Sequence, residues 1–248
     1  MKGVLLRGSL LNNFLKTSMN LQDRSATFIQ ENCTEGDKVD PRQSEVVAQY
    51  KPDIIIFEYP AGQDGPGLVF NDHPCSHKPL REVNRIKRWL HKAAESFPYA
   101  YSDILVWEKI EDLWAQGHEV KLYNVDAPAE VRREHYYHFP GTYEESKDDW
   151  LFQAFMYVRE SYMHSNWKTA LAPYDDQTDL TVAVFLQSLH WQGVSFLDSG
   201  PSKEEIWSYY FGSVSAPRPE TITQRIKERS PVLYNYWPVG FNGPRESV

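Results

Sequence analysis

The stretch that decides the fold is Asp53-Ile54-Ile55-Ile56-Phe57-Glu58, a continuous run of β-branched and aromatic residues. Such a run is typical of a strand that is covered on both faces, as strands in parallel sheets are. Lys51-Pro52 precedes the run, and proline forces the residue before it into an extended conformation. We therefore expect a buried strand near residues 53–58 at the centre of an α/β fold.

Shorter apolar runs elsewhere in the chain predict the rest of the sheet. We expect three further strands, near residues 3–7, 119–125 and 179–186. Apolar residues at helical spacing predict longer helices over residues 80–97, 103–116 and 148–171. Helices that lie between two strands imply a crossover connection, and crossovers join parallel strands. The sequence thus predicts a three-layer α/β domain whose central, mostly parallel sheet is flanked by helices.

The remaining segments complete a single domain over residues 1–248, a length that suits one compact core. Short helices are expected over residues 44–50, 202–210 and 221–229. The tail over about residues 230–248 contains Pro231, Pro238 and Pro244, and we expect it to be irregular.

Composition excludes several classes of partner. The net charge of −8 repels phosphate backbones and anionic membrane surfaces, so neither nucleic acid nor a membrane is an expected partner. No apolar run approaches the roughly 18 residues of a membrane span. The two cysteines, Cys33 and Cys75, form no disulfide framework, which fits a reducing, cytoplasmic location. The oligomeric state stays open.

Polar residues follow each predicted strand. The strands end at Gly8-Ser9, Glu58, Asp126 and His190. Ligands of open parallel sheets bind beyond the carboxyl ends of the strands, where the loops diverge. A carboxylate such as Glu58, directly after a buried run, requires a cation, a metal or hydrogen-bond donors. A structural salt bridge would also satisfy that requirement.

Further candidates lie next to these residues. Arg159 and Glu160 lie on the predicted helix 148–171, and Arg159 can neutralise Glu58 or an anionic substrate. The alternative is a solvated charge pair on the helix surface. His190 suits a ligand or a general base, or else a hydrogen-bonded structural residue. Trp191 beside His190, and Tyr59 beside Glu58, are candidates for binding a planar molecule.

The proline- and glycine-bearing segment 59–79 contains His73, Cys75 and His77, which are ligand types for Zn²⁺ or Fe²⁺. Their spacing matches no strong zinc pattern, so an ordinary loop is the alternative. The run His135-Tyr136-Tyr137-His138 is interpreted as helix or loop surface.

Read in order, these segments resemble the superfamily that includes TraB/PrgY proteins, TIKI proteases, ChaN-like lipoproteins and erythromycin esterases. KPDIIIFEYP is similar to its second strand, which ends in a functional glutamate, here Glu58. HEVKLYNVDAP is similar to the next strand, which closes with Asp126. RESYMHSN, from Arg159 to Asn166, resembles an Arg-acidic-x-x-Met-x-x-Asn helix.

The last motif and two departures complete the resemblance. VAVFLQSLHWQGV is similar to a strand that runs into a Gly-x-x-His turn followed by a glycine, which places His190 and Gly193 on those positions. Gln187 stands where glycine is usual. In the first strand's Gly-x-x-His element, Leu11 stands at the histidine's position.

The resemblance implies a hydrolase of metallopeptidase or esterase type, acting on a small molecule or a peptide. Glu58 would bind a divalent metal (Zn, Mn or Fe) or activate water, and His190 would be a ligand or base. Arg159 would stabilise an oxyanion, with Asp126 and Glu160 beside it. His73 or His77 would replace the missing histidine as a metal ligand, and backbone groups of Gly8 and Ser9 would form the floor.

Two alternatives belong to other classes. The same crevice would suit a noncatalytic protein that binds haem or another small ligand, as the ChaN-like relatives imply. The scaffold would equally suit a tailoring enzyme of a biosynthetic pathway, because the departures at Leu11 and Gln187 are compatible with a changed reaction.

Overall fold

The computed structural model describes most of the chain, and every structural statement below concerns that part. The described residues are 2–6, 27–31, 41–57, 88, 91–92, 95, 100–140, 143–174, 181–186 and 188–238. The predicted helix 80–97 and the loop 59–79 lie wholly or mostly outside these residues.

A small parallel sheet forms the first part of the structure. Its strands are β1 (Lys2–Leu6), β2 (Thr27–Glu31), β3 (Ile54–Phe57), β4 (Lys121–Asn124) and β5 (Thr181–Phe185). Their order across the sheet is β2-β1-β5-β3-β4, and every described pair is parallel. The predicted strands and their parallel direction are therefore confirmed. Strand β2 was not expected, because its sequence TFIQE has only two adjacent apolar residues.

Helices make up most of the remaining described residues. They are α2 (Arg42–Tyr50), α4 (Ala100–Ala115), α5 (Ala129–His138), α6 (Tyr143–Ser146), α7 (Trp150–Leu171), α8 (Ser188–Asp198), α9 (Lys203–Phe211), α10 (Pro219–Arg229) and α11 (Pro231–Tyr236), with a 3₁₀ turn at Ala172–Tyr174. Among the residues described, no helix has the length and apolar character needed to cross a membrane.

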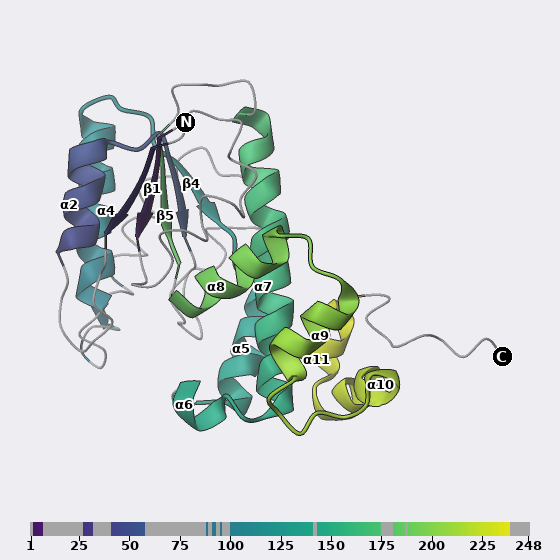
Figure 1. The fold of residues 1–248 in the computed structure, drawn as a ribbon. Coiled ribbons are helices and arrows are strands. Elements are labelled where there is room, and N and C mark those ends of the chain that lie inside the picture. The colour runs from purple at the N-terminus through teal and green to yellow at the C-terminus, as the bar shows by residue number, and fades with distance from the viewer. Residues whose placement is uncertain are drawn as a thin grey trace.

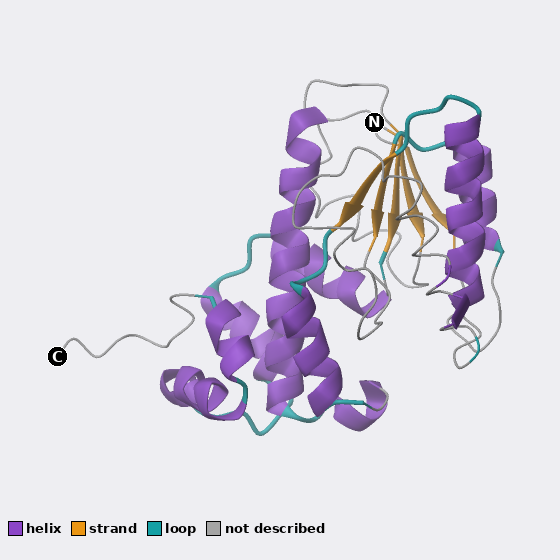
Figure 2. Ribbon diagram, turned by 180° about the vertical axis from the view of Figure 1, so that it is seen from behind, coloured by secondary structure: helices purple, strands orange, loops and turns teal. Residues whose placement is uncertain are grey.

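The helices gather in two places. Helices α2 and α4 lie on one side of the sheet and α7 lies on the other (Figure 1). Seen from behind, α7 continues well past the carboxyl ends of the strands, where the remaining helices surround it (Figure 2). The chain is thus α/β around the sheet and all-helical around the far half of α7.

Helix α7 contributes to two apolar cores. Its carboxyl-terminal half, with Met163 and Trp167, packs against Ile54, Ile56 and other sheet residues. Its amino-terminal half, with Phe155, packs against α5, α9, α10 and α11. Nearly every residue from position 151 to 160 is buried, as in any helix that is covered on all sides.

The tail differs from its predicted irregular conformation at α11. Ser230 starts this helix, because its Oγ accepts a hydrogen bond from the Leu233 backbone N–H at 3.1 Å. Pro231 then occupies the first helical position, where a missing N–H costs nothing. The proline that suggested an irregular tail therefore begins a helix. Residues 239–248 lie outside the described part of the chain.

Candidate functional site

The described strands end at one level. In the pairing register, Phe185 lies opposite both Leu6 and Phe57, and Phe57 lies opposite Asn124. The residues that follow β4 and β5 therefore leave the sheet along the same edge. Buried polar side chains gather beyond this edge, in the region where α7 passes from the first apolar core to the second.

The centre of this cluster is a two-pronged ion pair between Asp126 and Arg159. Nε of Arg159 donates to Oδ1 of Asp126 at 3.1 Å, and Nη2 donates to Oδ2 at 2.8 Å. The side chains are 0% and 3% exposed, so the pair is removed from water. The Ala127 backbone N–H donates a further hydrogen bond to Oδ1 at 2.7 Å, which fixes the carboxylate at the end of β4.

A second arginine favours the ionised form of Asp126. Nη1 of Arg132 on α5 lies 3.7 Å from Oδ2 of Asp126. Burial alone would raise the pKa of Asp126, but the charges of Arg159 and Arg132 outweigh it and hold that pKa below its ordinary value. Asp126 is therefore ionised at neutral pH and acts as the anchor of Arg159.

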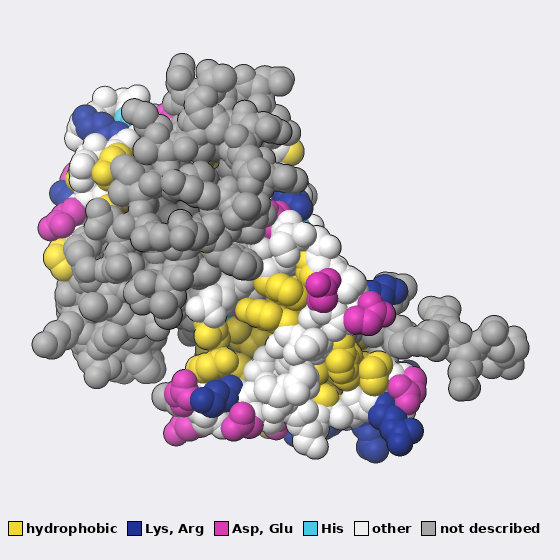
Figure 3. All heavy atoms as spheres, in the orientation of Figure 1, with side chains coloured by type: hydrophobic (Ala, Val, Ile, Leu, Met, Phe, Trp, Pro, Cys, Tyr) yellow, Lys and Arg dark blue, Asp and Glu magenta, His cyan; other side chains and the backbone are white. Residues whose placement is uncertain are grey.

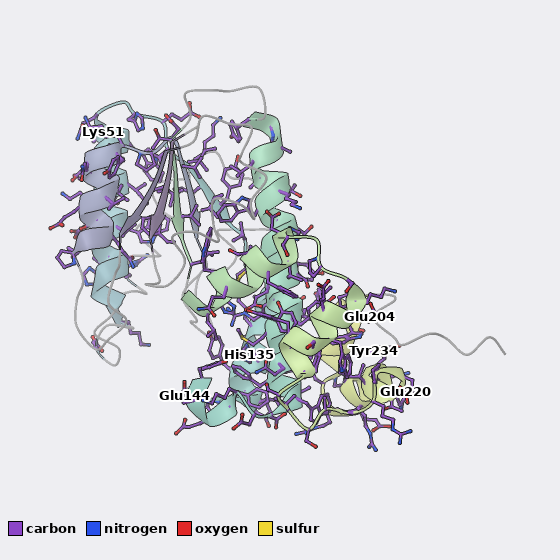
Figure 4. The ribbon with its side chains drawn as sticks, in the orientation of Figure 1. Lys51, His135, Glu144, Glu204, Glu220 and Tyr234 are labelled. Atoms are coloured by element: carbon purple, nitrogen blue, oxygen red, sulfur yellow. The ribbon has the colours of Figure 1, made fainter. Side chains whose placement is uncertain are left out.

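His135 provides a further contact for Arg159. Its Nδ1 lies 3.3 Å from Nη1 of Arg159, so the ring carries its proton on Nε2. The ring is stacked on Phe155, with centroids 5.1 Å apart. Burial, followed by the charge of Arg159, lowers the pKa of His135 well below its ordinary value, which keeps it neutral. Figure 4 labels His135 on α5, at the end of the molecule opposite Lys51.

The other half of the cluster is a carboxylate–imidazole pair. Nδ1 of His190, on the first turn of α8, lies 3.1 Å from Oε1 of Glu160 on α7, and both side chains are buried. The Tyr210 hydroxyl, on α9, donates to Oε2 of Glu160 at 2.6 Å. When Glu160 is ionised it accepts both bonds, and the lone pair of His190 then lies on Nε2.

Gly193 makes this pair possible by the absence of a side chain. A Cβ at this position would lie 1.7 Å from Oε2 of Glu160. The Glu160 carboxylate therefore occupies the space that the side chain of any other amino acid at position 193 would fill. Helices α7 and α8 pack together around this carboxylate.

Burial sets the protonation of the pair. It raises the pKa of Glu160, whereas the hydrogen bonds from His190 and Tyr210 oppose that rise. Burial, with the charge of Arg159, lowers the pKa of His190, and Glu160 opposes that change. When both histidines are neutral and Glu160 is ionised, the two carboxylates balance the two guanidinium groups of Arg159 and Arg132. This balance makes a buried polar cluster tolerable.

Residues of the segment RESYMHSN have structural roles at this cluster and at the end of β4. Arg159 and Glu160 supply the two pairs, and Met163 is fully buried in the core against the sheet. Asn166 donates from Nδ2 to the Val125 carbonyl at 3.2 Å, which attaches the end of β4 to α7. Each of these residues thus fixes either the cluster or the strand that leads into it.

The structure brings together four of the residues predicted from the sequence, namely Asp126, Arg159, Glu160 and His190. Trp191 lies in the core against the sheet, with its ring 5.7 Å from that of Trp167. The other candidates lie outside the described residues; they are Gly8, Ser9, Glu58, Tyr59, His73 and His77.

Three interpretations require correction. Arg159 and Glu160 do not form a solvated surface pair, because both are buried and face different partners. His135 does not lie on the surface but inside an aromatic cluster. His190 lies in the first turn of a helix, whereas a turn after the strand was expected.

Tyr210 was missed altogether. In the sequence it is one of two adjacent tyrosines in a short helix, and nothing local distinguishes it from Tyr209. Only the packing of α9 against α7 identifies it.

Among the described side chains, no group of three or more His, Cys, Asp or Glu residues is arranged to hold a metal ion. Of the four predicted metal ligands only His190 is described, and its Nδ1 faces Glu160. Whether the predicted ligand set converges on a metal therefore depends on Glu58, His73 and His77, which lie outside the described residues.

Gly193→Ala is expected to break the Glu160–His190 pair. The new methyl group displaces the Glu160 carboxylate from its two partners, so the free energy of unfolding falls by about 1–3 kcal/mol despite the better helix propensity of alanine. Urea denaturation measures the loss, with Gln192→Ala on the exposed side of α8 as the control. In a Glu160→Ala background the Gly193 substitution should cost nothing further. Equal losses in both backgrounds would contradict the proposed collision.

Asp126→Asn tests the ion pair through its pH dependence. Removing the charge strands a buried guanidinium, which costs about 3–5 kcal/mol at neutral pH. Because the folded state lowers the pKa of Asp126, the stability it contributes is present above the ordinary aspartate pKa, about 3.9, and is lost as pH falls through the lower folded-state value.

The difference between parent and variant should therefore shrink in acid. Urea denaturation between pH 7 and pH 3 measures this difference. Asp148→Asn, at an exposed aspartate, is the control and should change stability by less than about 0.5 kcal/mol at every pH. A pH-independent difference for Asp126→Asn would show that charge is not what Asp126 contributes.

Comparison of the chain with protein-family models, with curated proteins and with solved structures found no match.

Proposed function

We propose that this chain is a hydrolase that cleaves an ester or amide bond, with His190 as the general base. The observation that carries the proposal is the buried 3.1 Å contact between Nδ1 of His190 and Oε1 of Glu160. A carboxylate on one ring nitrogen fixes the tautomer and orients the other nitrogen, which is the arrangement that general-base catalysis needs.

In the proposed reaction, Nε2 of His190 takes a proton from a water molecule as its oxygen bonds to the carbonyl carbon of the substrate. The resulting tetrahedral oxyanion collapses, the bond to the leaving group breaks, and the same proton passes from Nε2 to that group. The lowered pKa of His190 supports this role, because the neutral, basic form is then present at neutral pH.

Arg159 supplies positive charge beside the base. Its two-pronged bond to Asp126 and its contact with His135 hold the guanidinium in place before any substrate arrives. Charge that is already oriented in a dry site stabilises an oxyanion without reorganisation. We therefore assign Asp126 and His135 as positioning residues for Arg159.

The wider interpretation from the sequence stays part of the proposal. Glu58 directly follows β3 in the sequence and is kept as a candidate for binding a divalent metal or activating water. Membership of the TraB/PrgY, TIKI, ChaN-like and erythromycin esterase superfamily, a cytoplasmic location and a three-layer architecture are likewise proposed. The helices on the two sides of the sheet support the three layers (Figure 1).

His190→Ala and the near-isosteric His190→Gln are expected to lower kcat by about 10²–10⁴-fold, the usual contribution of a general base. Glu160→Gln should lower it as well, because a neutral amide does not stabilise the imidazolium that forms when His190 takes the proton. The assay uses a panel of p-nitrophenyl esters and peptide amides, with and without added Zn²⁺, Mn²⁺ or Fe²⁺.

A matched control lies on the same two helices. His164, one turn after Glu160 on α7, bonds Asp198 on α8 at 2.9 Å; this pair is partly exposed and its described contacts do not include the cluster residues. His164→Ala should leave kcat unchanged. Full activity in folded His190→Ala and His190→Gln proteins, checked by circular dichroism, would refute the proposal.

Tyr210→Phe is expected to lower kcat by on the order of tenfold with KM unchanged, because one hydrogen bond to a charged group is lost. In a Glu160→Gln background the same substitution should have almost no effect, since Tyr210 acts through Glu160. Tyr157→Phe is the control, because Tyr157 packs beside Tyr210 while its hydroxyl bonds Ser161. Additive losses in the double variant would assign Tyr210 a merely structural role.

A further inference from the structure

Exposed aromatic side chains lie close to the buried cluster. Only three large apolar side chains are exposed among the residues that the structure describes: Tyr137 at 82%, Tyr209 at 44% and Tyr143 at 39%. Figure 3 shows apolar side chains gathered on the lower part of the face in view, in the region of α8 and α9. We use the term aromatic face for Tyr143, Phe196 and Tyr209.

Ring contacts connect this face to the catalytic pair. Tyr209 stacks on Phe196 of α8 with centroids 4.2 Å apart and planes at 10°. It also meets the edge of Tyr210 at 4.8 Å, and the Tyr210 hydroxyl is bonded to Glu160. The face therefore begins one ring away from the carboxylate that orients His190.

Tyr143, on α6, lies close enough to Tyr209 and Glu160 to interact with both electrostatically. Burial, followed by the charge of Glu160 and the nearness of Tyr143, raises the pKa of Tyr209. Burial raises the pKa of Tyr143 as well, and Glu160 adds to that rise. The buried carboxylate of Glu160 thus raises the pKa of both tyrosines. Tyr137, on α5, makes its described ring contact with His138, and no contact with Tyr209 or Glu160 is found among the described residues.

We propose that the aromatic face binds the uncharged, aromatic acyl group of an ester substrate whose carbonyl lies beside His190. This proposal rests on the proposed hydrolase function and names its substrate class. Partly exposed rings offer stacking and edge contacts to a further ring. The negative charge of Glu160 nearby disfavours an acyl group that carries a carboxylate.

The first experiment compares p-nitrophenyl phenylacetate with p-nitrophenyl acetate, which share a leaving group and differ in the acyl ring. Tyr209→Ser should lower the ratio of their kcat/KM values by about 2–10-fold, the worth of one aromatic contact. Tyr137→Ser removes an equally large exposed ring and should leave the ratio unchanged. An unchanged ratio in Tyr209→Ser would overturn the proposal.

A second experiment does not require hydrolysis. The neutral fluorescent probe N-phenyl-1-naphthylamine is titrated into the His190→Ala protein, with and without Tyr209→Ser or Tyr137→Ser. We expect the Kd to rise by about 2–10-fold with Tyr209→Ser only. Equal affinity in all three proteins would overturn the aromatic face, whatever the ester assays give. Tyr209-dependent binding without any hydrolysis would instead keep the face and refute the catalytic role of His190.

Discussion

The buried polar cluster at the carboxyl ends of the strands depends on the ion pair between Asp126 and Arg159. Taking both charges out of water costs several kcal/mol for each ion, and only near-ideal geometry with further hydrogen bonds offsets that cost. Here the guanidinium fork meets both carboxylate oxygens, and a backbone N–H completes the anchor. The same guanidinium also reaches His135, so one side chain fixes the end of β4, helix α7 and helix α5 relative to each other. A cluster held in this way is already ordered before a substrate binds.

Helix α7 explains why the charges are buried where they are. It is about 33 Å long, from 22 residues at about 1.5 Å each, so it extends past the sheet into a second apolar core. Arg159 and Glu160 lie between the residues that serve the two cores. Apolar packing on both sides excludes water from this junction, and low polarity strengthens each remaining electrostatic contact. Helix α7 thus holds two charged residues in a region from which the apolar cores on either side exclude water.

The sequence predicted the strands well and the cluster in part, and the difference has a physical basis. Strand β3 is a local property of Ile54-Ile55-Ile56-Phe57, and the strand-end rule led from it to Asp126 and His190. The partners of these residues are not local. Arg159 was expected to reach Glu58, which lies outside the described residues, or a substrate. Its pairing with Asp126 was not predicted, because it follows from how α7 crosses the end of β4. Tyr210 and His135 lie in helices whose packing partners are far away in the sequence, so no spacing rule identifies them.

Among the described residues, two histidine–carboxylate pairs join α7 to α8, and their comparison shows that residue type alone does not make a site. His164, one turn after Glu160 on α7, bonds Asp198, the last residue of α8, where Lys168 shares the carboxylate at 3.1 Å. Burial raises the pKa of Asp198, but the hydrogen bonds from His164 and Lys168 and the charge of Lys168 outweigh it, so the pKa of Asp198 is lowered. At His190 and Glu160 burial dominates instead, raising the carboxyl pKa and lowering that of the imidazole. Gly193 is what allows this second pair to form inside the helix contact, because it leaves room for a carboxylate between two backbones. The reactivity proposed for His190 therefore originates in a packing constraint: the same side chains placed one or two turns further along α7 would only stabilise the fold.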